Sequence, residues 1–101
     1  MKLGLSMIRV RNIALEETNL NGSNSIPMTC RLPCSAGHRL IVGRKSKDGN
    51  LIWRLDYDPE KGPHINIEDY RLGKGDKAIK KYISFNGNEE TFKSYLKQMN
   101  Q

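Results

Sequence analysis

The sequence predicts a small α+β domain in which an antiparallel meander of four strands packs against one C-terminal helix. Three observations support this prediction. Two runs of alternating apolar and polar residues flank a Pro/Gly turn, an Asp-Gly pair of the kind that closes hairpins precedes them, and a capped amphipathic segment ends the chain. With 101 residues, the chain is long enough for one domain with a single modest core.

The predicted strands alternate in a way that separates an apolar face from a polar one. Period-2 alternation directs Trp53 and Leu55 to one face and Arg54 and Asp56 to the other. Asp48-Gly49 provides the positive-φ positions of the first tight turn, and a Pro/Gly-rich segment forms the second. The four strands are predicted at 39–45, 51–58, 64–71 and 78–85.

The last element is predicted to be a helix over 89–99. Asn88 is a suitable N-cap because its side chain can accept a hydrogen bond from the first turn. Phe92, Leu96 and Met99 then follow at helical spacing, which gives the helix an apolar stripe able to cover one face of the sheet.

The N-terminal third gives weaker signals. Residues 3–13 fit a short strand or a short helix, and 19–27 are rich in Asn, Gly and Ser and end in a proline, which is typical of a loop. We therefore expect an N-terminal extension, 1–38, that is partly irregular, followed by a compact module, 39–101.

The charge of the chain favours an anionic partner. The formal net charge is +6 at pH 7, and the segment from Arg71 to Lys81 carries five cations and one acid. A phosphate backbone is expected to lie along such a segment. The alternative reading is an ordinary solvated lysine surface.

The polar face of the predicted sheet contains the groups that RNA cleavage without a metal ion requires. Such cleavage needs a base for the 2′-hydroxyl proton, an acid for the leaving 5′-oxygen and cations for the phosphorane charge. His64 is the leading catalytic candidate because a histidine can serve as an acid or a base, with Glu68 and Asp56 as its carboxylate partners. We expect a scissile group to fit between His64 and Glu68. The alternative is a strand-start histidine beside a surface salt bridge.

Six further residues are expected to hold the phosphate or the nucleotide. Gly73-Lys74-Gly75 lacks the spacing of a nucleotide-binding P-loop, so a basic loop that touches nucleic acid, or an ordinary turn, is expected there. The predicted substrate-binding residues are Arg54, Arg71, Lys74, Lys80, Lys81 and Tyr82.

No metal or cofactor is predicted. Cys30, Cys34 and His38 are spaced four apart, but Pro33 and Gly37 disfavour a helix that would align them, and no fourth ligand is evident. The cysteines are expected to be free thiols. The start of the chain lacks a signal-peptide core, so no export signal of its own is expected, and no membrane-spanning run is present in the sequence.

The second half of the chain resembles a known family. The block from Trp53 to Arg71, the Gly73-Lys74-Gly75 loop and the segment starting at Glu89 are similar to the C-terminal toxin modules of bacterial polymorphic toxins, over about residues 39–101. These modules are carried by large secreted proteins such as the Rhs and contact-dependent-inhibition proteins, and many are metal-independent ribonucleases of the barnase-like and RelE-like kinds. The resemblance implies that His64 leads the catalytic set and that an acidic immunity protein is the partner.

The prediction is therefore a ribonuclease-type toxin module that acts on RNA in the cytoplasm, delivered into a target cell by a carrier. Two other classes remain open. A non-catalytic nucleic-acid-binding module would use the same basic rim but would not need His64. A protein-interaction domain would use the polar face only as an interface.

Overall fold

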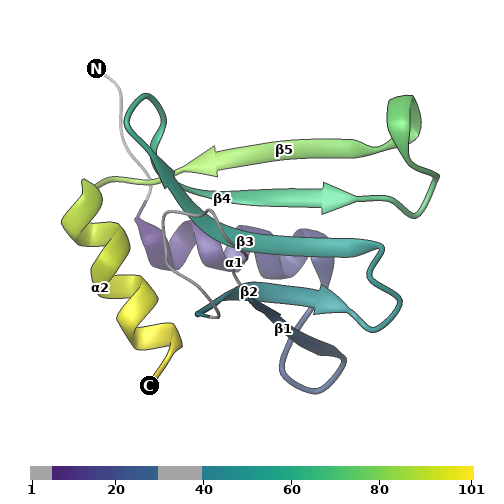
Figure 1. Ribbon diagram of the computed structural model, residues 1–101, viewed down its shortest axis with the longest axis horizontal. Helices are drawn as coiled ribbons and strands as arrows, with labels where there is room; N and C mark the ends of the chain where they lie inside the picture. The colour runs from purple at the N-terminus through teal and green to yellow at the C-terminus, as the bar shows by residue number, and fades with distance from the viewer. Residues whose placement is uncertain (1–5, 30–39) are drawn as a thin grey trace.

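The computed structural model describes residues 6–29 and 40–101, which form one five-stranded antiparallel sheet, two α-helices and a short 3-10 helix (Figure 1). The strands follow one another in the sheet in the order β1-β2-β3-β4-β5. The elements are α1 (Met7–Thr18), β1 (Ser25–Thr29), β2 (Ile41–Ser46), β3 (Leu51–Asp58), β4 (Gly62–Asp69), η1 (Gly75–Lys77), β5 (Ile79–Ser84) and α2 (Glu89–Met99).

The predicted α+β class, meander and C-terminal helix are confirmed. β3 and α2 have the bounds predicted for them, 51–58 and 89–99. β2, β4 and β5 begin and end within two residues of the strands predicted at 39–45, 64–71 and 78–85. Asn88 caps α2 as expected, because its side chain accepts a hydrogen bond from the backbone N–H of Thr91.

The N-terminal part contains two regular elements. A helix forms over 7–18, where the sequence left a short strand or a short helix open over 3–13, and a strand forms over 25–29, part of which was expected to be a loop. Ser6 caps α1 by accepting a hydrogen bond from the N–H of Arg9, and the helix continues to Thr18. β1 then adds a fifth strand at the edge of the sheet, where a residue such as Pro27 is tolerated. The predicted boundary at residue 38 lies outside the described residues.

Both helices contribute to a single core on one face of the sheet. α1 supplies Met7, Val10 and Ala14 at helical spacing, and α2 supplies Phe92 and Leu96. They meet alternate residues of the central strands: Trp53, Leu55, Ile65 and Ile67, each at most 4% exposed. In Figure 1, α1 runs along the strands behind the sheet, and α2 lies at the left end of the sheet.

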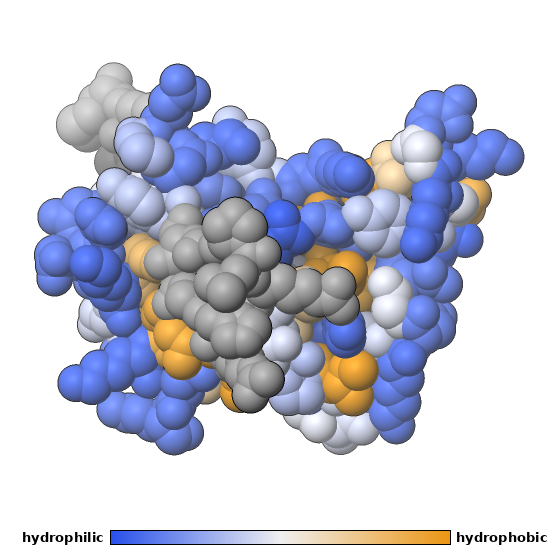
Figure 2. All heavy atoms as spheres, viewed as in Figure 1, coloured by the Kyte–Doolittle hydropathy of each residue, from blue (hydrophilic) through white to orange (hydrophobic). Residues whose placement is uncertain are grey.

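The opposite face of the sheet carries no helix among the described residues. In the view of Figure 1 this face is turned toward the reader, and Figure 2 shows mostly hydrophilic side chains along its upper edge, over β4 and β5. None of the helices in the described part of the chain is long and apolar enough to cross a bilayer.

Candidate functional site

Pairing between β3, β4 and β5 brings polar side chains from three strands next to one another. Residues that are paired across an antiparallel sheet point to the same face, so the register alone defines a polar grid. Its three rows are Ile52–Glu68–Lys80, Arg54–Asn66–Tyr82 and Asp56–His64–Ser84. We call the surface formed by Arg54, Asp56, His64, Asn66, Glu68, Lys80 and Tyr82 the polar face.

Glu68 is the most highly connected group on this face. Its Oε1 forms an ion pair with Nη1 of Arg54 on the neighbouring strand, and its Oε2 accepts a hydrogen bond of 2.5 Å from the Tyr70 hydroxyl. The Arg54 and Glu68 side chains are 30% and 18% exposed, so the pair is partly shielded yet open to solvent. Both carboxylate oxygens are therefore oriented by neighbours.

These contacts keep Glu68 ionised. Burial alone would raise its pKa, but the hydrogen bonds from Tyr70 and Arg54, together with the charges of Arg54 and Lys80, lower it below its ordinary value. The same hydrogen bond raises the pKa of Tyr70, because the neutral phenol is the form that donates to the carboxylate. An ionised carboxylate thus faces solvent at neutral pH.

Lysines surround this carboxylate. Lys80 is paired with Glu68 across β4 and β5, and the Nζ atoms of Lys74 and Lys80 each lie 5.8 Å from the centroid of the Tyr70 ring. The glycine-rich loop thereby brings Lys74 to the end of the polar face. A depression of about 320 Å³ lies here, and its lining includes Arg54, Lys61, Asn66, Glu68, Lys80 and Tyr82.

Tyr82 projects from the edge strand as a half-exposed aromatic ring. It is 50% exposed, and the Nζ of Lys61 lies 4.6 Å from its ring centroid. The ring of His64 meets it edge-on, with the centroids 5.5 Å apart. An aromatic ring beside cations is the arrangement on which nucleotide bases stack.

His64 does not lie where the sequence-based hypothesis needs it. The residue is only 2% exposed, and its Nδ1 lies 2.8 Å from the carbonyl oxygen of Gly62. Four residues separate it from Glu68 on β4, so about 13 Å of strand lies between their backbones at roughly 3.3 Å per residue. The expectation that one scissile group fits between the two side chains is therefore wrong.

Asp56 is paired with His64 in the register, but other groups hold its carboxylate. Its Oδ1 accepts a hydrogen bond of 2.8 Å from the backbone N–H of Tyr57, and its Oδ2 accepts one of 3.3 Å from Asn66. No hydrogen bond between His64 and Asp56 is found among residues 6–29 and 40–101. The structure thus gives Asp56 a role in holding Asn66.

Two predicted phosphate-binding residues are engaged elsewhere. Arg71 forms a bidentate pair with Asp69, with its Nε and Nη2 at 3.0 and 2.8 Å from the carboxylate oxygens. Lys81 alternates to the helix-covered face, where its Nζ lies 2.6 Å from Oε2 of Glu17 in α1, although it still borders the depression at the sheet edge. Of the six predicted binding residues, Arg54, Lys74, Lys80 and Tyr82 gather around Glu68.

The sequence analysis missed two members of this cluster. Tyr70 lies two residues after Glu68, so period-2 alternation places both on one face and could have indicated their contact. Lys61 lies in the turn before β4, and no periodicity indicates which way a turn residue points. The set Cys30, Cys34 and His38, which was not predicted to bind a metal, lies outside the described residues. The part that is described contains no group of three His, Cys, Asp or Glu suited to a metal.

Comparisons with known proteins do not identify a family for this chain. No family model matches the sequence, and a search of curated proteins found no match.

Proposed function

We propose that this chain is a bacterial toxin module that cleaves RNA without a metal ion, using the polar face. The observation that carries the proposal is the Glu68 cluster. It combines a carboxylate that is ionised at neutral pH with the cations Arg54 and Lys80 in one open depression. A base and phosphate-binding cations in one place are the parts that cleavage through the 2′-hydroxyl requires.

In the proposed reaction, Glu68 accepts the proton of the 2′-hydroxyl, and the 2′-oxygen attacks the adjacent phosphorus. Arg54 stabilises the negative charge of the phosphorane by hydrogen bonds. The Lys80 ammonium gives a proton to the 5′-oxygen as its bond to phosphorus breaks. The products are a 2′,3′-cyclic phosphate and a 5′-hydroxyl end, and the two side chains then exchange protons with water.

The neighbouring residues position the reacting groups. Tyr70 holds the Glu68 carboxylate through its 2.5 Å hydrogen bond, and the exposed ring of Tyr82 offers a surface on which a base can stack. His64 supports Tyr82 from the buried side. In this proposal Glu68 takes the catalytic part that the sequence analysis assigned first to His64.

The test is cleavage of a labelled single-stranded RNA by the purified protein in the presence of a metal chelator. We expect fragments with 2′,3′-cyclic phosphate ends, and Glu68→Gln should slow cleavage by about 10²-fold or more because a general base is lost. Glu89→Gln is the matched control, since Glu89 is an exposed carboxylate on α2. His64→Gln should retain more activity than Glu68→Gln.

The outcome that contradicts the proposal is an intact RNA with folded wild-type protein, or equal cleavage by wild type and Glu68→Gln. Growth of a bacterium after induced expression gives a second readout, because a toxin should arrest growth and Glu68→Gln should relieve the arrest. A His64→Gln variant that is inactive while it keeps the wild-type thermal midpoint would return the catalytic role to the histidine.

A second candidate is a module that binds nucleic acid without cleaving it. The burial of His64, at 2% exposure, favours this candidate because it removes one acid/base group from contact with RNA. It predicts intact RNA, bound with an affinity that falls steeply with salt concentration. Charge reversal at Lys74 and Lys80 would then abolish binding, while Glu68→Gln would strengthen it.

The proposed partner, besides RNA, is an acidic immunity protein that covers the polar face. A chain with a net charge of +6 and exposed lysines around the depression is electrostatically suited to such a partner. The proposed site of action is the cytoplasm of the target cell.

A further inference from the structure

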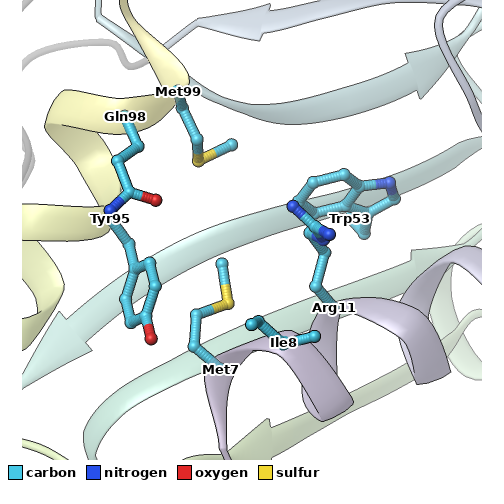
Figure 3. A pocket seen from close by; sticks show the side chains of 7 residues that line it. All are labelled: Met7, Ile8, Arg11, Trp53, Tyr95, Gln98 and Met99. Atoms are coloured by element: carbon cyan, nitrogen blue, oxygen red, sulfur yellow. The ribbon is translucent and has the colours of Figure 1, made fainter.

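A second cavity lies on the other side of the sheet, between the two helices. It has a volume of about 610 Å³, and the indole of Trp53, on β3, forms part of its wall. Figure 3 shows side chains from α1 and α2 converging on this space from two directions. A volume of this size falls within the range of roughly 300–1,000 Å³ that small-molecule sites occupy.

The lining comes from one face of each helix. α1 contributes Met7, Ile8 and Arg11, and α2 contributes Tyr95, Gln98 and Met99, at spacings that place each set on one side of its helix. Both helices therefore pack on the sheet but leave a gap between themselves beside Trp53. This gap is a feature of how the elements pack, since each described residue that lines it belongs to α1, α2 or β3.

The chemistry of the lining is amphipathic. Met7, Trp53 and Met99 give it an apolar floor, and methionine side chains adapt readily to the shape of a ligand. Arg11 is the only charged group among the described residues that line the cavity, and no acid accompanies it. Arg11 is exposed, and Figure 3 shows its side chain extending from α1 toward the space that Trp53 borders.

We propose that this cavity binds a free single-chain amphipathic carboxylate, such as a fatty acid anion. The apolar chain would lie against Ile8, Tyr95 and Met99, above the buried Trp53 and Met7. Its carboxylate would accept hydrogen bonds from Arg11. The positive charge selects an anion over a neutral or cationic amphiphile, because a charge-assisted hydrogen bond is worth about twice a neutral one. The volume of the cavity and its apolar lining favour a ligand with an alkyl chain over a small inorganic anion.

This site is independent of the proposed RNA site. Trp53 and Arg54 are neighbours on β3, so their side chains point to opposite faces of the sheet. Binding in the cavity can therefore be tested with full-length protein whether or not the chain cleaves RNA. The Arg54 and Glu68 variants should leave it unchanged.

The chain provides its own reporter, because Trp53 is its only tryptophan. The probe is sodium decanoate below its micelle concentration, and the signals are tryptophan fluorescence and the thermal midpoint. We expect a saturable fluorescence change and a rise in the midpoint, since a ligand that binds only the folded state stabilises it. Decanol, which has the same chain without the charge, should bind roughly tenfold more weakly.

Two arginines on one helix give a matched pair of variants. Arg11→Gln should weaken decanoate binding by roughly tenfold and leave decanol binding unchanged. Arg9→Gln is the control, because Arg9 is exposed on α1 and does not line the cavity. Both variants change an exposed side chain, so both should keep the wild-type midpoint in the absence of ligand.

Several results would overturn the proposal. One is the absence of a saturable fluorescence change with folded protein. Another is equal weakening by Arg11→Gln and Arg9→Gln, which would mean that decanoate responds only to overall charge. A third is a midpoint that falls with decanoate, which indicates binding to the unfolded chain. If sedimentation shows that decanoate dissociates a dimer, a second copy of the chain is the occupant instead.

Discussion

The two faces of the sheet divide stability and chemistry between them. Along β3, Leu55 is 2% exposed beneath the helices, while its neighbour Arg54 has a side chain that is 30% exposed and paired with Glu68. Successive residues of one strand therefore experience different surroundings. The helix-covered face gains its free energy from burial, and the polar face can hold charged groups that a core would exclude. Substitutions on the helix-covered face should consequently lower stability, and substitutions on the polar face should mainly impair function.

The largest expected effect is on the helix-covered face. Phe92 is 1% exposed, and its ring centroid lies 5.8 Å from that of Tyr57. Phe92→Ala should lower the free energy of unfolding by about 3–5 kcal/mol because it leaves a cavity between α2 and the sheet. Urea denaturation measures this change. A loss below about 1 kcal/mol would mean that α2 does not pack as described.

The next largest effect is expected at Gly43, where the backbones of β2 and β3 approach each other closely. A Cβ atom on Gly43 would lie 1.9 Å from the carbonyl oxygen of Trp53, which forces β2 and β3 apart. Gly43→Ala should therefore cost about 1–3 kcal/mol of unfolding free energy.

Gly22→Ala is the matched control for this substitution. A Cβ on Gly22 meets nothing within 4 Å, and the residue lies in the turn before β1. The same denaturation experiment on both variants checks the prediction, and equal midpoints would contradict the close approach of β2 and β3.

The polar face could be predicted from the sequence to the extent that alternation determines it. Period 2 placed Arg54 and Glu68 together, because an antiparallel meander with tight turns fixes the register. It could not reveal that Lys81 pairs with Glu17, since that contact depends on how α1 docks. It also could not show the burial of His64, which depends on tertiary packing rather than on strand periodicity.

The edge strand β1 was missed for a different reason, whereas a short helix over 3–13 was one of the two alternatives that the sequence left open. The helix α1 has Ser6 as a cap and a narrow apolar stripe, but the short, polar segment 19–27 after it reads as a loop in isolation. β1 exists because β2 offers an edge with which it can pair, and a pairing partner is not a local property of the sequence. Local patterns therefore predicted the central strands better than the edge.

The Arg54–Glu68 pair tests whether the polar face contributes to function more than to stability. Arg54→Met leaves the Glu68 carboxylate without its cation and should cost about 1–2 kcal/mol of unfolding free energy. Adding Glu68→Leu should recover most of that loss, because an apolar pair replaces a partly buried ion pair with little penalty. Urea denaturation and RNA cleavage are measured on the same samples.

Both variants should lack RNA cleavage, although only the single variant is destabilised. That combination would separate function from folding on this face. If the double variant were as unstable as Arg54→Met, the pair would be a structural requirement, and the division between the two faces would not hold at Glu68.

The smallest effect is expected at Asp69, the last residue of β4, when the pH is lowered. Hydrogen bonds from Arg71 lower the pKa of Asp69 to about 2, from an ordinary value of 3.8. The unfolded state therefore binds a proton at a higher pH than the folded state does, so this contribution is complete above pH 4 to 5 and is lost as the pH falls toward 2. Because the Arg71 side chain is 60% exposed, solvent screens the pair and keeps its contribution small.

Asp69→Asn removes that contribution, so its deficit relative to wild type should be present at neutral pH and disappear toward pH 2. Urea midpoints across this range measure it. Asp76→Asn is the control, since Asp76 is exposed in η1 and forms no ion pair within the described ranges. A deficit for Asp69→Asn that grows as the pH falls would contradict the assigned direction of the shift. The acid sensitivity of the fold would then have to come from other carboxylates with a lowered pKa, among them Glu68, the proposed catalytic group.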